Sequence, residues 1–429
     1  MKTNRIFGLA SDVRLESYID RGGLDAEVKK YLDRDTHIAL NGASKCGKSW
    51  LRQTAIPDGN VVQVQLNWKV TDIYVAALAN LGIRLKIHEM DKTSFCGTLQ
   101  ASGEMGVNLL AKVAGNLQIE ANTERSVSYM DLKYDINNLA SIAKLLRSSE
   151  KRLIIEDFHY LSNEERRKFA FGLKTLWDLG CFVVIVGVWV EQNLLTHLNG
   201  DLTGRITELS ILWNDQDLLA VIDKGCPQLN IDLSDSIKQQ LVNDSFGNVG
   251  ILQQLLLNLI EDQAGIEATQ QSKVVIEDEE LYHKATSQYA DQLNGLYHQF
   301  AKKVSAGIRK TADSTGIYAR AMEAIVEASD EDLIKGLSRN TIFDKAHKRQ
   351  PRIQAANLKS IMNKLVDLQV DDGNRNLVIA YDESTECVYI VDRQLLFYRK
   401  YLNIKWPWED LAKEFDKDRE LPGQTILLP

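Results

Sequence analysis

The chain has 429 residues, 44% of them hydrophobic, which is enough for two or three domains with a sizeable buried core. Its formal net charge is −8, which excludes a protein that coats nucleic acid through bulk positive charge, while a local basic patch stays compatible with it. Five scattered cysteines without C-x-x-C spacing argue against a zinc site or a disulfide framework. The first residues lack an apolar signal core and no apolar run reaches the length of a membrane span, so we expect a cytoplasmic protein with no membrane partner.

The first predicted elements lead into a phosphate loop. Apolar residues recur at helical spacing over 17–32, and a β-prone run over 36–40 follows. The next residues, Gly42-Ala43-Ser44-Lys45-Cys46-Gly47-Lys48-Ser49, fit the pattern G-x-x-x-x-G-K-[ST] and open a predicted helix. In such a loop backbone N–H groups surround the phosphates, the Lys48 ammonium reaches the β and γ oxygens, and the Ser49 hydroxyl is a ligand for Mg²⁺. The sequence therefore predicts a nucleoside triphosphate site; the alternative is a glycine turn without a ligand.

Strands and helices alternate beyond the loop. Residues 61–66 are predicted to form a second strand, with a helix over 72–81 behind it. The segment from about 93 to 128 is rich in small residues and has weak periodicity, so we expect an insertion there, either a β-hairpin or a loop. Three further elements complete a doubly wound α/β sheet: a strand over 151–157, a helix over 164–179 and a strand over 182–188.

Two adjacent acids end one of these strands. The apolar run that finishes in Glu156 and Asp157 places both carboxylates at the carboxyl edge of the sheet, beside the phosphate loop. Hydrolysis of a triphosphate needs a metal anchor and a group that orients or deprotonates water. We assign Glu156 to the metal and Asp157 to the water and leave the reverse assignment open. The alternative is that the pair only caps the strand.

The pattern of predicted elements changes twice in the second half of the chain. Three helical segments between 215 and about 263 predict a helical lid on the sheet domain. The remainder, about 285–402, contains helices and one late β-hairpin, 377–381 against 387–391, which is the element order of a winged helix. The predicted parts are an ATPase core, a lid with its extension, a winged helix and a tail, at residues 1–214, 215–300, 301–405 and 406–429.

A local basic patch lies in the predicted winged helix. Its members are Lys335, Arg339, Lys345, Lys348, Arg349, Arg352, Lys359 and Lys364. If 354–368 is a recognition helix, Arg352 and Lys359 would meet phosphate or base edges of DNA. Asn374 and Arg375 of the wing would then meet the adjacent groove. The alternatives are a solvated face and a surface for a partner protein.

Four segments carry a family resemblance: Ser17-Tyr18-Ile19-Asp20-Arg21, the phosphate loop, residues 154–161 and residues 200–206. Together they resemble the AAA+ and STAND-type ATPases of the bacterial origin-recognition/Cdc6-like group, over about residues 10–265 and more loosely in the winged helix. The resemblance implies an AAA+-like P-loop sheet with a lid over the adenine, and ATP with Mg²⁺ as the cofactors. It also implies that Tyr18 and Arg21 border the adenine, for which ordinary packing is the alternative.

The resemblance implies a role for Arg205 as well. In this family an arginine near the end of the ATPase core reaches into the neighbouring subunit's site and neutralises charge on the γ-phosphoryl group. Arg205 stands at that place, so a homo-oligomer is implied; a structural ion pair is the alternative. Two departures from the family pattern predict slow or partner-stimulated hydrolysis. Residues 246–250 lack an arginine as second sensor, and the strand ending Gly187-Val188-Trp189 lacks a polar first sensor.

Two functions are compatible with these features. The first is an ATP-binding and hydrolysing switch that oligomerises and controls a separate effector protein, which the resemblance places in mobile elements or bacterial antiviral defence systems. The second is an initiator- or transposition-type ATPase that acts on duplex DNA through its winged helix. Hydrolysis that duplex DNA stimulates and salt suppresses would distinguish the second from the first. A small-molecule kinase with the same loop is the least favoured, because of the winged helix and the segment 200–206.

Overall fold

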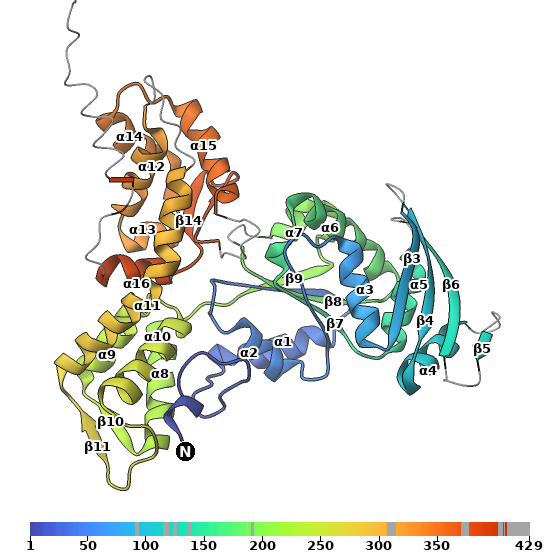
Figure 1. Cartoon of the computed structure of the whole chain (residues 1–429), viewed down its shortest axis with the longest axis horizontal. Helices are drawn as coiled ribbons and strands as arrows, with labels where there is room; N and C mark the ends of the chain where they lie inside the picture. The colour runs from blue at the N-terminus through green and yellow to red at the C-terminus, as the bar shows by residue number, and fades with distance from the viewer. Residues whose placement is uncertain are drawn as a thin grey trace, which may run out of the picture.

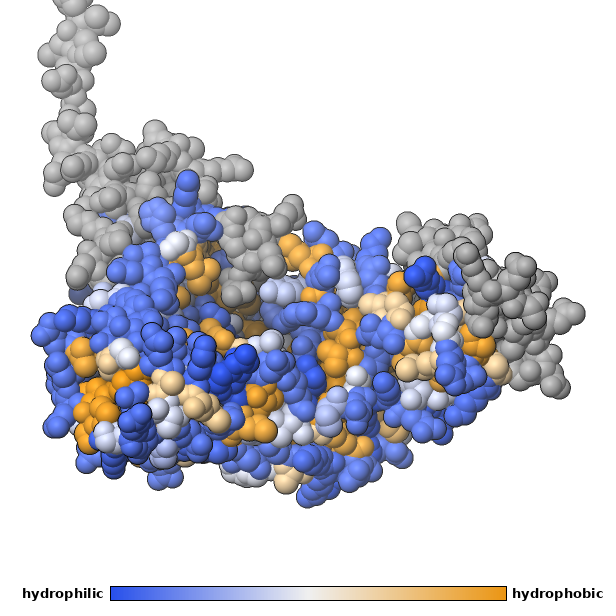
Figure 2. Space-filling model, turned by 60° about the horizontal axis from the view of Figure 1, so that its bottom comes forward, coloured by the Kyte–Doolittle hydropathy of each residue, from blue (hydrophilic) through white to orange (hydrophobic). Residues whose placement is uncertain are grey.

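The computed structural model describes residues 1–90, 94–114, 120–122, 127–135, 139–189, 193–306, 315–369, 377–401, 406, 408 and 409. Figure 1 shows a sheet domain, a helical lid beside it and a C-terminal domain above the lid. On the face shown in Figure 2 the described surface is mostly hydrophilic, and hydrophobic side chains form separate patches. Within the described ranges, no helix is long and apolar enough to cross a membrane.

The sheet domain is built on five parallel strands in the order β2-β7-β8-β1-β9. Successive side chains of a strand point to opposite faces, and here both faces are apolar. In β1, Ala39 belongs to one core cluster, while Ile38 and Leu40 belong to another. The strands are β1 (His37–Asn41), β2 (Asn60–Gln63), β7 (Leu153–Glu156), β8 (Val183–Gly187) and β9 (Ile206–Ser210).

Helices cover both faces of this sheet. Residues of α1 and α2 share the core cluster of Ile38, and residues of α3, α5 and α6 share that of Ala39. This arrangement confirms the predicted α/β P-loop sheet, because the phosphate loop leads directly from β1 into α2. The helices are α1 (Leu24–Leu32), α2 (Lys48–Ala55), α3 (Val70–Asn80), α5 (Ala140–Ser148), α6 (Asn163–Asp178) and α7 (Leu194–Leu198).

The predicted insertion is larger than the sequence indicates. A four-stranded antiparallel sheet in the order β3-β4-β6-β5 carries α4 (Gly103–Ala114) and lies at the end of the sheet domain far from the C-terminal domain (Figure 1). The expected limits of about 93 and 128 therefore fall inside this sheet. Its core is continuous with the main one, because Leu99 and Leu110 share a cluster with Leu78 of α3. The strands are β3 (Ile83–Met90), β4 (Ser94–Ala101), β5 (Glu120–Asn122) and β6 (Val127–Asp135).

The lid combines three helices with a short parallel strand pair. A side-chain oxygen of Asn214, Ser234 or Asn248 accepts a backbone N–H bond at the start of each helix, which explains where the helices begin. The first residues of the chain also belong to this part, since Ile6 and Phe7 lie in its core. The elements are α8 (Asp215–Gly225), β10 (Ile231–Leu233), α9 (Asp235–Asp244), α10 (Val249–Leu257) and β11 (Val274–Ile276).

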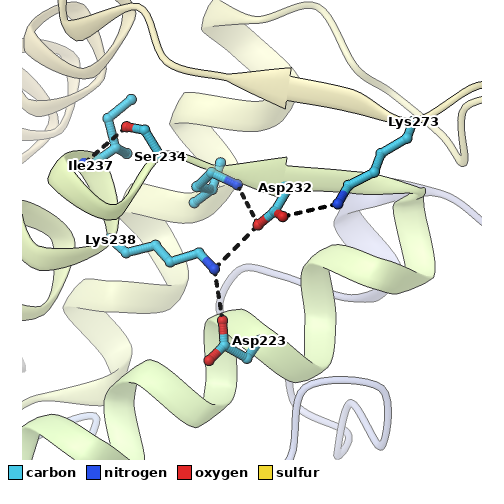
Figure 3. A network of polar contacts seen from close by, with 7 residues as sticks. Asp223, Asp232, Ser234, Ile237, Lys238 and Lys273 are labelled. Atoms are coloured by element: carbon cyan, nitrogen blue, oxygen red, sulfur yellow. Dashed lines mark hydrogen bonds and ion pairs between the residues drawn. The ribbon is translucent and has the colours of Figure 1, made fainter.

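An ion-pair network joins the lid elements, as Figure 3 shows. Lys238 of α9 lies 2.9 Å from Asp223 of α8 and 3.2 Å from Asp232 of β10. Lys273, just before β11, lies 3.1 Å from the other carboxylate oxygen of Asp232. Because the network spans α8, β10, α9 and the approach to β11, we expect the lid to move as one body.

The C-terminal domain is reached through α11 (Glu279–Ala306), a helix that runs from the lid into it, so the predicted boundary at 301 falls inside a helix. Beyond α11 the order is helices, strand, two helices and two strands, with antiparallel pairing in the order β12-β14-β13. The predicted hairpin is confirmed, with Tyr381 opposite Val388. The elements are α12 (Ile317–Val326), α13 (Asp330–Lys335), β12 (Leu337–Ser338), α14 (Arg339–Arg349), α15 (Ala355–Asp367), β13 (Ile379–Asp382), β14 (Cys387–Ile390) and α16 (Gln394–Tyr401). Asn374, Arg375 and most of the predicted tail lie outside the described residues.

Candidate phosphate-binding site

A pocket of about 290 Å³ lies at the carboxyl edge of the parallel sheet. Four parts of the chain line it: the N-terminal segment, the phosphate loop with the start of α2, the turns after β7 and β8, and the start of α10. The lining residues are Gly8, Leu9, Ala10, residues 44–50, Asp157, His159, Tyr160, Val188, Val249, Gly250 and Gln253. Ligands of open α/β sheets bind at this edge. The sequence predicted the loop and Asp157 in this set but missed the N-terminal segment and the lid residues.

The phosphate loop turns into α2 at Gly47. This residue has φ 86° and stands at the N-cap of the helix, and a Cβ there would lie 3.3 Å from Nη1 of Arg21. Both the positive φ and the close approach favour glycine. The turn brings the N-terminus of α2 to the pocket, where its unpaired N–H groups and its dipole favour an anion.

Three carbonyl groups of the loop are held by hydrogen bonds from the surrounding structure. Ser44 O accepts from Asn248 Nδ2 at 2.8 Å, Lys45 O from the N–H of Gly250 at 3.1 Å, and Cys46 O from Arg21 Nη1 at 3.0 Å and Trp213 Nε1 at 2.9 Å. In a trans peptide the C=O and the following N–H point in opposite directions. The N–H groups of Lys45, Cys46 and Gly47 are therefore directed away from these donors, toward the pocket. Consecutive N–H groups of this kind form an anion-binding nest.

The ammonium of Lys48 lies over the loop. Its Nζ donates to Gly42 O at 3.1 Å and Ala43 O at 2.6 Å. Ser49 follows in the first turn of α2, and its side chain is exposed to the pocket that Lys48 also lines. The structure thus places a cation, a nest of N–H groups and a hydroxyl around one pocket, as the sequence pattern predicts.

The structure separates the two acids that the sequence puts side by side. Asp157 lines the pocket in a left-handed conformation, φ 56°, and its Oδ2 accepts a hydrogen bond from Gln63 Nε2 at 2.9 Å. Glu156 is not among the described lining residues. Its carboxylate pairs with Arg52 Nε at 2.9 Å, with both side chains little exposed. Asp157 is therefore the carboxylate that a ligand would meet first.

The oxygen donors at the pocket fit Mg²⁺. Within the described ranges, no group of three or more His, Cys, Asp or Glu side chains could hold a metal ion alone. A magnesium ion keeps several waters and takes one or two protein ligands together with phosphate oxygens. Ser49 lines the pocket and its hydroxyl can serve as one such ligand, while Asp157 lines it as a carboxylate that can act on water. Glu156, the predicted metal ligand, faces Arg52 instead.

His159 and Tyr160 are pocket residues that the sequence analysis left without a role. Their rings are in contact and tilted to each other, with 4.4 Å between centroids and 40° between the ring planes. Burial, together with the nearby cations Lys48 and Arg166, lowers the pKa of His159 to about 3, so the ring is neutral at physiological pH. Both residues belong to the segment 154–161 that carries the family resemblance. That resemblance is the sequence feature that could have indicated them as pocket residues.

Arg21 contacts the phosphate loop through Cys46, and neither Arg21 nor Tyr18 is among the described lining residues of the pocket, so their place beside the adenine stays a prediction. Arg21 is only 6% exposed and stacks on Trp213, with 4.4 Å from Cζ to the ring centroid. Its Nε and Nη2 are enclosed without a hydrogen-bond partner, so this cation adds positive potential beneath the loop. The Tyr18 hydroxyl donates to Asp25 at 2.5 Å, a contact that serves packing.

Arg205 lies at the opposite edge of the sheet from its own pocket. Its carbonyl accepts a hydrogen bond from the N–H of His37, the first residue of β1, whereas the phosphate loop follows the last residue of β1. The strand is five residues long and so separates Arg205 from the loop by roughly 15 Å. The guanidinium stacks on Trp177, 4.8 Å from the ring centroid, and donates to the carbonyl of Asp201. Arg205 could meet a nucleotide only in a neighbouring copy of the chain.

The C-terminal domain contacts the outer side of the phosphate loop. Gln394, at the start of α16, accepts a hydrogen bond from Lys45 Nζ at 2.5 Å, and Val391 O accepts one from the N–H of Ser44 at 3.4 Å. Gln394 is 1% exposed, and its Nε2 donates to the Tyr289 hydroxyl at 2.5 Å, which fixes the side chain. The loop therefore lies between the pocket and the C-terminal domain.

The basic patch of the C-terminal domain is partly neutralised by acids of the same domain. Its ion pairs are Lys335–Glu331, Arg339–Glu386, Arg349–Glu327 and Lys359–Glu386. Lys348, Arg352 and Lys364 are exposed and form no ion pair with a described residue. The structure describes two of the predicted DNA contacts, Arg352 and Lys359. Arg352 is a solvated cation, whereas Lys359 lies 3.8 Å from the carboxylate of Glu386.

No family model and no curated protein matches the chain. Similar solved structures include Cdc6p from Pyrobaculum aerophilum, with 10% identity, 92% of each chain covered and a TM-score of 0.33. ORC1 from Aeropyrum pernix in complex with DNA has 9% identity, the same coverage and a TM-score of 0.35. A Signal Transduction ATPase with Numerous Domains with a tetratricopeptide repeat sensor, from Pyrococcus horikoshii, is 13% identical over 94% of this chain and 45% of its own, with a TM-score of 0.36. These values are too low to assign a function to this chain.

Proposed function

We propose that the chain is an ATP-binding and hydrolysing switch that oligomerises and controls a separate effector protein. The observation that carries the proposal is the position of the phosphate loop, which lines the pocket on one side and bonds to the C-terminal domain on the other. Phosphate bound in the pocket would compete with Val391 and Gln394 for the Ser44 N–H and the Lys45 ammonium. Binding would thus favour release of the C-terminal domain. The antiviral-defence setting stays a prediction of the family resemblance.

The residues in and near the pocket have different roles in hydrolysis. Lys48 and the N–H groups of Lys45, Cys46 and Gly47 bind the phosphates and stabilise the negative charge of the transferred group. When bound, Mg²⁺ supplies charge neutralisation at the β and γ oxygens, with Ser49 as its ligand. Asp157 orients the attacking water and accepts a hydrogen bond from it. Glu156 pairs with Arg52 at the end of β7, next to Asp157 in the chain, and is a positioning residue.

The switch predicts opposite effects for two substitutions of Gln394. Gln394→Leu removes the acceptor for Lys45, so ATP affinity should rise about fivefold, because a contact that opposes ATP binding is lost and the coupling is reciprocal. Gln394→Glu should lower ATP affinity, since its carboxylate strengthens the pair with Lys45 and can accept a hydrogen bond from the Tyr289 hydroxyl in place of the one that the Gln394 amide donates. Titration of the full-length variants with ATP and Mg²⁺ measures both effects. Equal affinities in both variants and the wild type would overturn the coupling.

The oligomer predicts that Arg205 acts on a neighbouring copy. Arg205→Ala should bind ATP as the wild type does but hydrolyse it at least about 100-fold more slowly, because charge on the γ-phosphoryl group is no longer neutralised. Mixing Arg205→Ala with Asp157→Asn should restore part of the activity, since each variant supplies what the other lacks. Measuring phosphate release over a series of mixing ratios tests this recovery of activity. No recovery at any ratio would count against an action in trans.

DNA binding is the second candidate function. The observation in its favour is that Lys348, Arg352 and Lys364 are exposed and without acidic partners among the described residues of the C-terminal domain. A strong dependence of duplex binding on salt, with hydrolysis stimulated by the same duplex, would support it. Hydrolysis that is indifferent to DNA favours the protein-controlled switch.

A further inference from the structure

We propose that His159 donates a hydrogen bond from Nε2 to the terminal phosphate of ATP and thereby distinguishes ATP from ADP. The inference rests on the proposed function, because it takes the pocket to be an ATP site. His159 belongs neither to the phosphate loop nor to the acidic pair, yet it lines the pocket together with Asp157 and Lys48.

One ring nitrogen of His159 is available to a ligand. Nδ1 is enclosed by protein and has no hydrogen-bond partner among the residues that the structure describes. The backbone is fixed, because the carbonyl of His159 accepts from Arg166 Nη2 at 2.6 Å within the turn Phe158–Tyr160. Contact with the tilted Tyr160 ring, 4.4 Å away between centroids, restricts the side chain as well. Nε2 is therefore the nitrogen that can reach into the pocket.

The proton of the neutral ring belongs on Nε2. Placed on Nδ1, it would be an enclosed N–H without an acceptor, which is among the rarest states of a polar group in proteins. Placed on Nε2, it is a donor directed to the pocket, and Nδ1 keeps only a lone pair. The cations Lys48 and Arg166 near the ring disfavour a second proton. His159 thus offers the pocket a neutral donor.

The neighbours of His159 identify the phosphate that it meets. Lys48 is close enough to act electrostatically on the ring, and the lysine of a phosphate loop reaches the β and γ oxygens. Asp157, two residues earlier, is the acid that we place at the water attacking the γ-phosphorus. His159 follows it in the same turn after β7 and so belongs to the γ end of the pocket.

A hydrogen-bond donor in the turn after β7 supplies a contact that the described part of the turn after β8 lacks. The turn after β8 presents Val188, an apolar side chain, to the same pocket. Asp157 and His159 both line the pocket from the turn after β7. Asp157 is an anion, so it cannot bond to phosphate without a cation between them. His159 can bond to a phosphate oxygen directly. A hydrogen bond from this neutral donor to the charged γ-phosphate stabilises bound ATP. ADP has no γ-phosphate, so the same donor does not stabilise bound ADP.

Titration of the full-length chain with ADP and with the slowly hydrolysed analogue ATPγS, each with Mg²⁺, tests the inference. His159→Phe keeps a ring in contact with Tyr160 but has no donor, so its affinity for ATPγS should fall about 10- to 100-fold, with ADP affinity unchanged within about twofold. His159→Gln places an amide N–H near the position of Nε2 and should regain most of the affinity. Thermal melting of both variants confirms that they fold.

Three results would overturn the inference. Equal losses of ADP and ATPγS affinity would place His159 at the β-phosphate or in a structural role, and unchanged affinities would remove it from the site. Equal affinities of His159→Gln and His159→Phe would show that the donor is not what matters. If the wild-type chain bound neither nucleotide, the proposed function would fail along with this inference, and the first titration alone shows whether that is so.

Discussion

Lys48→Ala is expected to weaken ATP binding by about 100-fold and to leave the fold intact. The ammonium is the cation aimed at the β and γ oxygens, and hydrogen bonds to charged groups contribute about 1.5–3 kcal/mol each. In the structure Lys48 bonds only to loop carbonyls and the Cys46 thiol, so its removal breaks no contact between elements of the core. Titration with ATP, paired with a thermal melt of the same sample, measures the effect.

Lys45→Ala is the matched control for that experiment. Lys45 is a second lysine of the same loop, but its ammonium contacts Gln394 of the C-terminal domain. Its removal should lower ATP affinity far less than that of Lys48, because the loss of a cation near the phosphates is offset by the loss of the Gln394 contact that opposes nucleotide binding. Unchanged affinity in Lys48→Ala, or a comparable loss in both variants, would mean that the pocket is not a triphosphate site of the proposed kind.

Asp157→Asn is expected to retain ATP binding and to lower the rate of hydrolysis by about 10²- to 10⁴-fold. A positioned acid or base contributes that much to a proton transfer, and Asp157 is the acid that lines the pocket. The amide is of the same size and can still contact Gln63, so the turn after β7 should keep its shape. Steady-state phosphate release with Mg²⁺, together with an ATP titration, separates chemistry from binding.

Glu156→Gln distinguishes the two assignments of the acidic pair. Glu156 pairs with Arg52 and does not line the pocket, so its substitution should slow hydrolysis far less than that of Asp157. A larger loss in Glu156→Gln than in Asp157→Asn would reverse the roles that the structure supports. Loss of ATP binding in both variants would instead place the pair in phosphate or metal binding.

The sequence predicted the parts of the site that depend on local pattern. The phosphate loop has fixed glycine spacing, and the apolar runs of β1, β7 and β8 are typical of buried parallel strands, so the sheet and its carboxyl edge follow from them. The antiparallel sheet from Ile83 to Asp135 was only partly predicted. Strand β3 alternates strictly between apolar and polar residues from Ile83 to His88, a strand signal that the sequence analysis missed, whereas β4 is richer in small residues and pairing between distant segments completes the sheet.

The contacts that tie the parts together could not be predicted from the sequence. Lys45 and Gln394 are separated by 349 positions, and no local pattern marks either residue as a partner of the other. Glu156 and its partner Arg52 are likewise separated by 104 positions, although the alternation of side chains along a strand already indicates that Glu156 and Asp157 point in different directions. Arg21 was placed near the pocket by resemblance, but its stacking on Trp213 follows from no local pattern.

The central claim is that ATP and the C-terminal domain compete for the phosphate loop. Amide hydrogen exchange of the full-length chain, with and without ATP and Mg²⁺, tests it most directly, because exchange reports local opening segment by segment. We expect ATP to slow exchange in residues 42–49 and to speed it in residues 387–401, the segment of β14 and α16 that contacts the loop. Slower exchange in the loop with no change in residues 387–401 would show an ATP site without the switch. No change in either segment would contradict the site itself.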